Sequence, residues 1–128
     1  MTKKLVSLLL ALVMVCGLVT CAQAEGYKIG FANASVSNSW RVKMRDMLMT
    51  AAAEKGVQIV ETDAHDDAST MISNIETLLQ QNLDAFLITP CTEDGVNAGI
   101  EMAYASGIPV IIFDRECSTE DFTHFIGY

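Results

Sequence analysis

The sequence predicts an α/β domain built on a doubly wound parallel sheet with the strand order 2-1-3-4-5. Short apolar runs recur at nearly even intervals, and most lack the polar alternation of a strand with one solvated face. Such runs are typical of parallel strands covered on both faces. Segments with helical periodicity separate the runs, which indicates right-handed crossovers and helices on both sides of the sheet. The runs are 28–32, 57–61, 85–89 and 110–113, with a weaker fifth strand expected at 124–127.

The first 24 residues are predicted to be a secretory signal peptide that precedes the fold. Lys3 and Lys4 supply positive charge, 5–20 is apolar, and Ala22-Gln23-Ala24 is an A-x-A cleavage site. The apolar run is shorter than the roughly 20 residues that a membrane-spanning helix needs. We therefore expect cleavage after Ala24, export to the periplasm or cell envelope, and one domain over 25–128.

Cys21 offers an alternative route of processing, in which its thiol is lipidated and the protein becomes a lipoprotein. Thr20 precedes it where the bacterial lipobox prefers a small residue, and the first strand begins only a few residues later. Lipidation is therefore ranked behind simple cleavage. Mass spectrometry that finds Glu25 at the mature N-terminus would exclude the lipid.

The charge balance is acidic and excludes two classes of partner. The chain has 16 Asp and Glu against 8 Lys and Arg, and two of those lysines lie in the leader. Such a surface repels nucleic acid and anionic headgroups, and no basic stripe is present in the sequence. DNA, RNA and peripheral membrane binding are disfavoured. The 104 residues that follow the leader are enough for one core.

Three helices are expected between the strands. The first, at 39–55, ends at Gly56, a good left-handed terminator. The second begins after Asp66 or Asp67, either of which can cap its first turn, and the third spans 94–106 and ends at Gly107. Helical spacing predicts these inward residues: Trp40, Met44, Met47, Leu48 and Ala51 in the first helix; Met71 or Ile72, Ile75, Leu78 and Leu79 in the second; Val96, Ile100 and Ala103 in the third.

A ligand of such a sheet lies beyond the carboxyl ends of its strands. Asp114-Arg115 ends an entirely apolar strand, and Trp40 follows the Ser- and Asn-rich loop after the first strand. A carboxylate beside a guanidinium supplies the acceptors and donors that vicinal sugar hydroxyls require, and an indole can stack on the apolar face of a sugar ring. Taken singly, Asp114-Arg115 is equally well a surface ion pair and Trp40 a core anchor.

Three motifs together resemble the bacterial periplasmic sugar-binding proteins of the ribose and galactofuranose type. They are VSNSWR after the first strand, the apolar strand that ends in FDR, and TPCTEDG between them. The resemblance runs from about Tyr27 to Tyr128. It implies one lobe of a type I periplasmic binding protein, a monomer that captures a monosaccharide for the membrane permease of an ABC importer. It also implies no reaction and no cofactor.

Carried over by position, the resemblance makes five residues sugar contacts: Asn38, Trp40, Arg41, Asp114 and Arg115. Ser37 and Asp63 are further candidates. Ribose binders have aromatic residues at the positions of both Trp40 and Arg41, so Arg41 looks more like the galactofuranose-binding branch. The identity of the sugar stays open.

The chain departs from this family in extent. Family members trap sugar between two similar lobes joined by hinge strands, and this chain matches only the first. The resemblance therefore implies an N-terminal lobe that carries half a site, with weak or undetectable sugar binding when alone.

Two other groups of residues have simpler interpretations. Asp63, His65, Asp66 and Asp67 lack a fixed metal-ligand spacing, so helix capping and a solvated acidic turn are preferred and no metal is expected. Export would allow a disulfide between Cys91 and Cys117, both near strand ends, although two unpaired thiols are the preferred interpretation.

Three rival functions stay open at this point. The effector-binding core of a LacI-type transcriptional regulator shares the lobe design, but it would begin with a helix-turn-helix rather than an export signal. A small flavodoxin-like enzyme or flavoprotein lacks support, because the sequence contains no phosphate loop and no nucleophile–base pair. A truncated, nonfunctional remnant of a binding-protein gene is the third.

Overall fold

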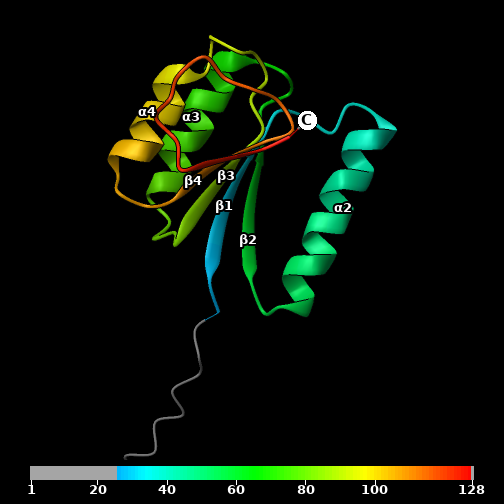
Figure 1. The fold of residues 1–128 in the computed structure, drawn as a ribbon. Helices are drawn as coiled ribbons and strands as arrows, with labels where there is room; N and C mark the ends of the chain where they lie inside the picture. Colours follow the sequence, from blue (N-terminus) through cyan, green and yellow to red (C-terminus); the bar gives the residue numbers. More distant parts are fainter. Residues whose placement is uncertain (1–25, 128) are drawn as a thin grey trace, which may run out of the picture.

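The computed structural model describes residues 26–127, which form a parallel sheet with the strand order β2-β1-β3-β4-β5. The predicted strand order and the α/β class are therefore confirmed. Figure 1 shows α2 on one side of the sheet and the pair α3 and α4 on the other. The elements are β1 (Lys28–Asn33), α2 (Ser39–Glu54), β2 (Gln58–Asp63), α3 (Ala68–Leu79), β3 (Ala85–Ile88), α4 (Asn97–Ala105), β4 (Val110–Phe113) and β5 (His124–Ile126).

The strand register places the carboxyl ends of neighbouring strands side by side. Asn33 at the end of β1 pairs with Asp63 at the end of β2. Ala32 pairs with Ile88 of β3, which in turn pairs with Ile112 of β4. β2 ends two residues later than predicted, because pairing with β1 continues to Asp63. The loops that follow these strands therefore leave from one common edge, which we call the carboxyl edge.

The main core lies between the sheet and the pair α3–α4. The predicted stripe of α4 is confirmed, since Val96, Ile100 and Ala103 are fully buried. Of the alternatives in α3, Met71 rather than Ile72 is at the centre of the buried face. The other fully buried apolar residues on this side are Ile75, Leu78, Phe86, Ile88, Val110 and Ile112. Apolar burial on this scale is the main stabilising contribution to such a fold.

The predicted inward face of α2 is wrong in part, since Trp40, Met47 and Ala51 are exposed whereas Met44 and Leu48 are half-buried. Trp40 and Met47 are 49% and 64% exposed, and the buried residues of the helix are Arg41 and Ala52. The cause is electrostatic, because the face toward the sheet carries two arginines that pair with carboxylates of the sheet, Asp114 and Glu61. The apolar stripe is rotated to the flank of the helix, where Met44 and Leu48 are half-buried beside Phe113 of β4.

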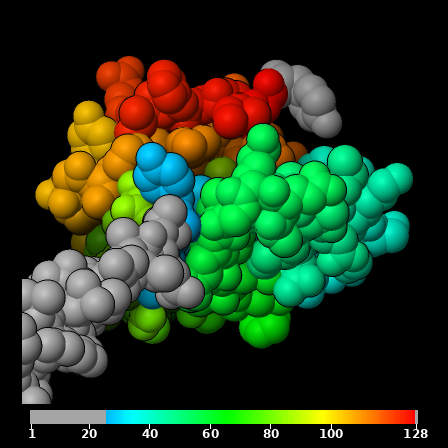
Figure 2. Space-filling model, turned by 90° about the horizontal axis from the view of Figure 1, so that it is seen from below, coloured from blue at the N-terminus to red at the C-terminus, as the bar shows by residue number. Residues whose placement is uncertain are grey.

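Helix ends follow the local chemistry. Gly56 and Gly107 have the left-handed φ angles, +67° and +84°, that favour glycine after a helix. α4 begins at Asn97, three residues later than predicted, because Thr92 Oγ1 accepts from the N–H of Gly95 and holds 92–96 in turns. Figure 2 views the molecule from the amino ends of the strands, with α2 (teal) and α4 (orange) on opposite sides. Within 26–127, no helix is long and apolar enough to span a membrane.

Candidate functional site

A largely buried ion pair joins the first turn of α2 to the end of β4. Arg41 Nη2 lies 3.3 Å from Asp114 Oδ2, and the two side chains are 4% and 15% exposed. The other terminal nitrogen of Arg41, Nη1, is buried and has no hydrogen-bond partner among the described residues. An unpaired buried N–H group is costly and uncommon, so an acceptor from outside the described chain would satisfy it. The sequence motif thus brings two of its predicted contacts together across 73 residues.

Asp114 occupies a strained backbone position. Its φ is +72°, and the N–H of Arg115 donates to the carbonyl of Phe113 at 2.9 Å, which closes a three-residue turn. This is the rarer and more strained form of the γ-turn. Asp tolerates positive φ better than most residues do, and strained residues cluster at functional sites. The turn directs the Asp114 side chain toward α2 at the point where β4 ends.

Trp40 lies beside this ion pair and is half exposed. A cavity of about 180 Å³ separates it from the ends of β4 and β5. The lining residues are Trp40, Phe113, Asp114, Ile126 and Gly127. The ring is therefore neither a core anchor nor fully solvated, and it offers apolar area next to charged groups. This arrangement suits a ligand that has both an apolar face and hydroxyls.

Asn38 has a structural partner. Its Oδ1 accepts from the backbone N–H of Arg41 at 3.0 Å, so it is the N-cap of α2. A cap of this type typically contributes about 1 kcal/mol. Asn38 thereby fixes the first turn of α2, from which both Trp40 and Arg41 project. Its amide nitrogen forms no hydrogen bond within residues 26–127 and is free to donate to a ligand.

Arg115 points to the loop after β3. Its Nη1 donates to the carbonyl of Cys91 at 2.8 Å and lies 4.0 Å from Asp66 Oδ1. The side chain is 44% exposed, so part of the guanidinium faces solvent. Adjacent residues Asp114 and Arg115 thus point in different directions and do not pair with each other. The simple surface ion pair between them, which the sequence allowed, is not formed.

Ser37 belongs to a small polar cluster between the loops that follow β1 and β2. Ser35 Oγ and Ser37 Oγ lie 2.9 Å apart, and both donate to Asp66 Oδ2, at 2.7 and 3.3 Å. Ser35 is buried, whereas Ser37 is exposed at the carboxyl edge. Of the two predicted capping candidates, Asp67 rather than Asp66 caps α3, by accepting from the N–H of Thr70. Hydrogen bonds from Thr70 lower the pKa of Asp67.

Asp63 is occupied by its own turn. Its Oδ1 accepts from the N–H of His65 at 2.8 Å, and Oδ2 lies 3.4 Å from His65 Nδ1. The side chain is 23% exposed. A carboxylate that holds a local turn is a weaker candidate for ligand contact than one with a free oxygen. Asp63 stays a prediction, without a feature of the structure that favours it.

A buried polar chain supports the edge from below, and sequence reasoning missed its role. Thr89 Oγ1 accepts from the N–H of Ala34 and donates to Asn33 Oδ1, and Asn33 Nδ2 donates to Glu61. Glu61 in turn binds Arg45 of α2, and this hydrogen bond raises the pKa of Arg45. A signal was present in the sequence, since Asn33 ends an otherwise apolar strand. The chain connects β1, β2, β3 and α2, and fixes where the first loop begins.

The two cysteines are free in the structure, so the disulfide that the sequence allowed is not formed. Their side chains point to separate partners. Cys91 Sγ is buried 4.0 Å from Met71 Sδ, and Cys117 Sγ contacts the carbonyl oxygen of Thr119. Burial raises the pKa of both thiols. They are therefore predominantly protonated and weakly nucleophilic at neutral pH.

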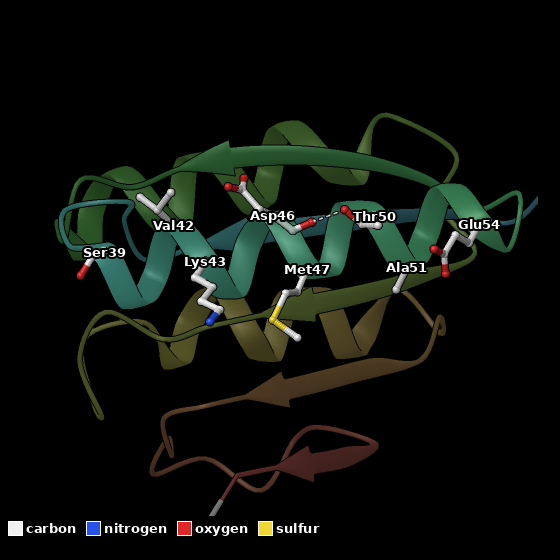
Figure 3. A pocket seen from close by; sticks show the side chains of 8 residues that line it. All are labelled: Ser39, Val42, Lys43, Asp46, Met47, Thr50, Ala51 and Glu54. Carbon is white, nitrogen blue, oxygen red and sulfur yellow. Dashed lines mark hydrogen bonds between the residues drawn. The ribbon is translucent and has the colours of Figure 1, made fainter.

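Two other places within the described residues were candidates for a site, a hollow on α2 and a possible metal-binding cluster. Figure 3 shows a shallow hollow whose eight lining side chains all come from α2, on the face turned away from the sheet. It has no polar groups from a second element that could converge on a ligand. Within 26–127, no group of three or more His, Cys, Asp or Glu side chains is placed to hold a metal ion.

Comparison with known proteins identifies relatives of the whole described domain. The family model described as "Periplasmic binding protein domain" matches residues 29–128. The ribose import binding protein RbsB of Bacillus subtilis is 32% identical over 89 residues, which cover 70% of this chain and 29% of that protein. The galactofuranose-binding protein YtfQ of Escherichia coli is 23% identical and covers 78% of this chain and 31% of that protein.

A solved structure from Mycobacterium smegmatis, in complex with β-D-fucofuranose, superposes with a TM-score of 0.75 at 30% identity. The superposed region covers 80% of this chain and 34% of the Mycobacterium smegmatis chain. The chain thus spans about a third of the length of the relatives that it matches. The chain belongs to the periplasmic binding protein family, and residues 26–127 have the fold of one lobe of a type I periplasmic binding protein.

Proposed function

We propose that residues 25–128 are the N-terminal lobe of a protein that captures a monosaccharide for an ABC importer. The observation that carries this proposal is the buried pair Arg41–Asp114 beside the half-exposed ring of Trp40. The pair leaves one buried guanidinium nitrogen without a partner. A sugar hydroxyl or ring oxygen is an acceptor of suitable size and charge for that nitrogen.

Each of the proposed contacts has a separate part in sugar recognition. Trp40 would cover the C–H face of the ring, and the cavity between it and Phe113 would admit the ring edge. Asp114 would accept hydroxyl protons, and Arg41 and Arg115 would donate from two sides. Asn38 would donate through its amide, and Ser37 lies next to it at the edge. Mixed donors and acceptors of this kind match vicinal hydroxyls, each of which both donates and accepts.

The other half of the sugar site would be supplied by a second lobe, which corresponds to the part of the relatives that this chain does not match. The chain covers 29% to 34% of the relatives named above. Closing a second lobe over the carboxyl edge would desolvate the sugar, and the closed form would be what the permease recognises. By itself, the lobe should bind sugar with a dissociation constant no tighter than millimolar, about −4 kcal/mol.

Export and cleavage after Ala24 belong to the same proposal. A further relative supports it, the D-xylose-binding periplasmic protein of Haemophilus influenzae, which is 27% identical over 107 residues. Residues 1–25 lie outside the described structure, so the leader and Cys21 are argued from the sequence alone. We propose a periplasmic location for the mature chain and a monomeric state.

Trp40 provides the test, because it is the single tryptophan of the chain. Titration with D-ribose, D-galactose and D-xylose should change its fluorescence in a saturable way at millimolar sugar. Trp40→Phe, which removes the fluorophore, serves as the optical blank. Calorimetry should detect no micromolar binding, and a micromolar constant would contradict the half-site. A fluorescence signal that stays constant for all sugars would contradict the proposal itself.

A further inference from the structure

We propose that Asp66 is a positioning residue of the sugar site, which holds Arg115 and Ser37 in place for the ligand. This inference rests on the proposed function, because it concerns the same carboxyl edge. Asp66 itself is 44% exposed and lies in the loop after β2, between strand and helix. It contacts residues from the loops after β1 and β4, and through Arg115 it reaches the loop after β3.

The backbone first brings Asp66 to this place. His65 and Asp66 are two successive residues with left-handed φ angles, +52° and +59°. They turn the chain back so that the N–H of Asp66 donates to the carbonyl of Ala34 at 2.8 Å. The N–H of Ala64 donates likewise to Asn33, at 2.9 Å. Non-glycine residues in this region of φ are strained, so the surrounding contacts must hold them there.

The two oxygens of the Asp66 carboxylate have separate partners. Oδ2 accepts from the hydroxyls of Ser35 and Ser37, at 2.7 and 3.3 Å. Oδ1 faces Arg115 Nη1 at 4.0 Å. One side chain therefore orders a buried serine and an exposed serine of the loop after β1 and an arginine of the loop after β4. Since Oδ2 is hydrogen-bonded and Oδ1 lies at ion-pair distance from Arg115, Asp66 acts through these neighbours.

Arg115 depends on this carboxylate for its orientation. The one hydrogen bond of its side chain within the described residues is from Nη1 to the carbonyl of Cys91, at 2.8 Å. Asp66 attracts the same Nη1, so both partners hold the guanidinium from one end. Nε and Nη2 form no hydrogen bond within 26–127, and these are the donors left for a ligand. Without the Asp66 charge, a long half-exposed side chain would be anchored by one carbonyl alone.

Asp67 provides a matched control. It is the next residue in the chain and carries the same charge, but its Oδ1 accepts from the N–H of Thr70 and caps α3. Within the described part of the chain, no hydrogen bond or ion pair joins it to either serine or to Arg115. Asp67→Asn therefore removes one negative charge from the same loop and leaves the edge intact. Comparison with Asp66→Asn separates the position of the charge from its presence.

The first measurement needs no sugar. In ¹⁵N-labelled chain, the heteronuclear NOE of the Arg115 Nε–H group reports how rigidly the guanidinium is held. Asp66→Asn keeps an acceptor for the two serines but removes the charge opposite Arg115, so the NOE should fall. Asp67→Asn should leave it unchanged. An Arg115 NOE that is the same in wild type and in Asp66→Asn would overturn the positioning role.

The second measurement is a double-mutant cycle on sugar affinity, read from Trp40 fluorescence with D-ribose and D-galactose. Asp66→Asn should weaken the sugar affinity about threefold to tenfold, in the range typical of one charged contact. In the Arg115→Ala background, Asp66→Asn should weaken it far less, because Arg115 is then no longer there to be positioned. Equal, additive losses in both backgrounds would overturn the inference.

The two proposals fail in different ways. Wild-type chain that responds to neither sugar refutes the proposed function, while the Arg115 NOE still decides whether Asp66 orders Arg115. Wild-type chain that responds, with Asp66→Asn equal to wild type, refutes the positioning role alone. Thermal unfolding of every variant shows whether a loss of binding is a loss of fold, and Asp66→Asn is the variant expected to stay folded.

Discussion

Arg41 is the one charged residue in 26–127 that is buried, at 3% exposure. A buried charge is tolerated only where an opposite charge and hydrogen bonds offset its desolvation. Asp114 offers one such contact and leaves Nη1 unpaired. The site thus has a residue that is structurally incomplete without a further acceptor. The proposed function depends on this unpaired nitrogen of Arg41.

Replacing Asp114 tests what its side chain contributes to stability, apart from any contact with a ligand. Asp114→Ala leaves the Arg41 charge buried without its partner, and should lower the free energy of unfolding by about 3 kcal/mol. Asp114→Asn keeps an acceptor oxygen and a residue type that tolerates φ of +72°, so it should cost less. Urea unfolding of both variants is the measurement. Equal costs would contradict this, because they would show that the acceptor oxygen and the tolerance of positive φ that Asn retains contribute nothing to stability.

In a complete two-lobe protein, Asp114→Ala and Trp40→Ala should each weaken sugar binding more than tenfold, or about 1.4 kcal/mol. Trp40 is half exposed and contributes little to the core, so its replacement should change affinity much more than stability. Calorimetry together with thermal unfolding makes this comparison. Lower stability with unchanged affinity would return both residues to a purely structural role.

The lowered pKa of Asp67 predicts how the free energy of unfolding depends on pH. Hydrogen bonds from Thr70 lower its pKa below the ordinary value of 3.8. A carboxyl group with a lowered pKa stabilises the folded state above its unfolded pKa, and this contribution is lost as the pH falls through the folded pKa. Asp67→Asn should therefore make the free energy of unfolding less dependent on pH below about 4. Urea unfolding of the wild type and of Asp67→Asn at acid and neutral pH tests it, and an unchanged pH dependence would contradict it.

At the scale of elements, α2 shows where sequence periodicity misleads. The helix has several apolar residues at helical spacing, which predict a buried face. The structure instead turns Arg41 and Arg45 toward the sheet, where they pair with Asp114 and Glu61. These carboxylates are distant in the sequence, so the apolar pattern contains no sign of them. α3 and α4 pack on the sheet mainly through apolar side chains, and there the pattern predicted the buried face.

The rotation of α2 predicts unequal costs for two methionine replacements. Met71 of α3 is fully buried, so Met71→Ala should destabilise the fold by about 2–5 kcal/mol. Met47 of α2 is 64% exposed, and Met47→Ala should change stability by no more than about 0.5 kcal/mol. Urea unfolding of the two variants under one condition compares them directly. A large cost at Met47 would mean that the apolar stripe of α2 is buried in solution.

The same contrast explains how much of the site was predictable. Asn38, Trp40, Arg41, Asp114 and Arg115 were named from motifs, and the strand order predicted that the first and fourth loops share an edge. The motifs could not show that Arg41 pairs with Asp114 while Arg115 points to Cys91. Nor could they assign Asp66, because two adjacent aspartates before a helix are equivalent as caps until the backbone angles are known.

At the scale of the whole molecule, the sheet gathers these residues and the core fixes them. All five strands are parallel, so their carboxyl ends meet at one edge, as in other open α/β folds that bind ligands there. The buried chain from Thr89 through Asn33 to Glu61 lies directly beneath that edge. The loops are therefore mounted on a rigid base, which lowers the cost of ordering them when a ligand binds.

The central claim is that this edge binds a sugar, and NMR titration of ¹⁵N-labelled chain with D-ribose and D-galactose tests it most directly. The account predicts millimolar, saturable shifts concentrated at Trp40, Arg41, Asp114 and Arg115, together with the indole N–H of Trp40. The amino ends of the strands and the outer face of α2 should not respond. Shifts centred on those other surfaces, or no shifts with either sugar, would contradict the claim.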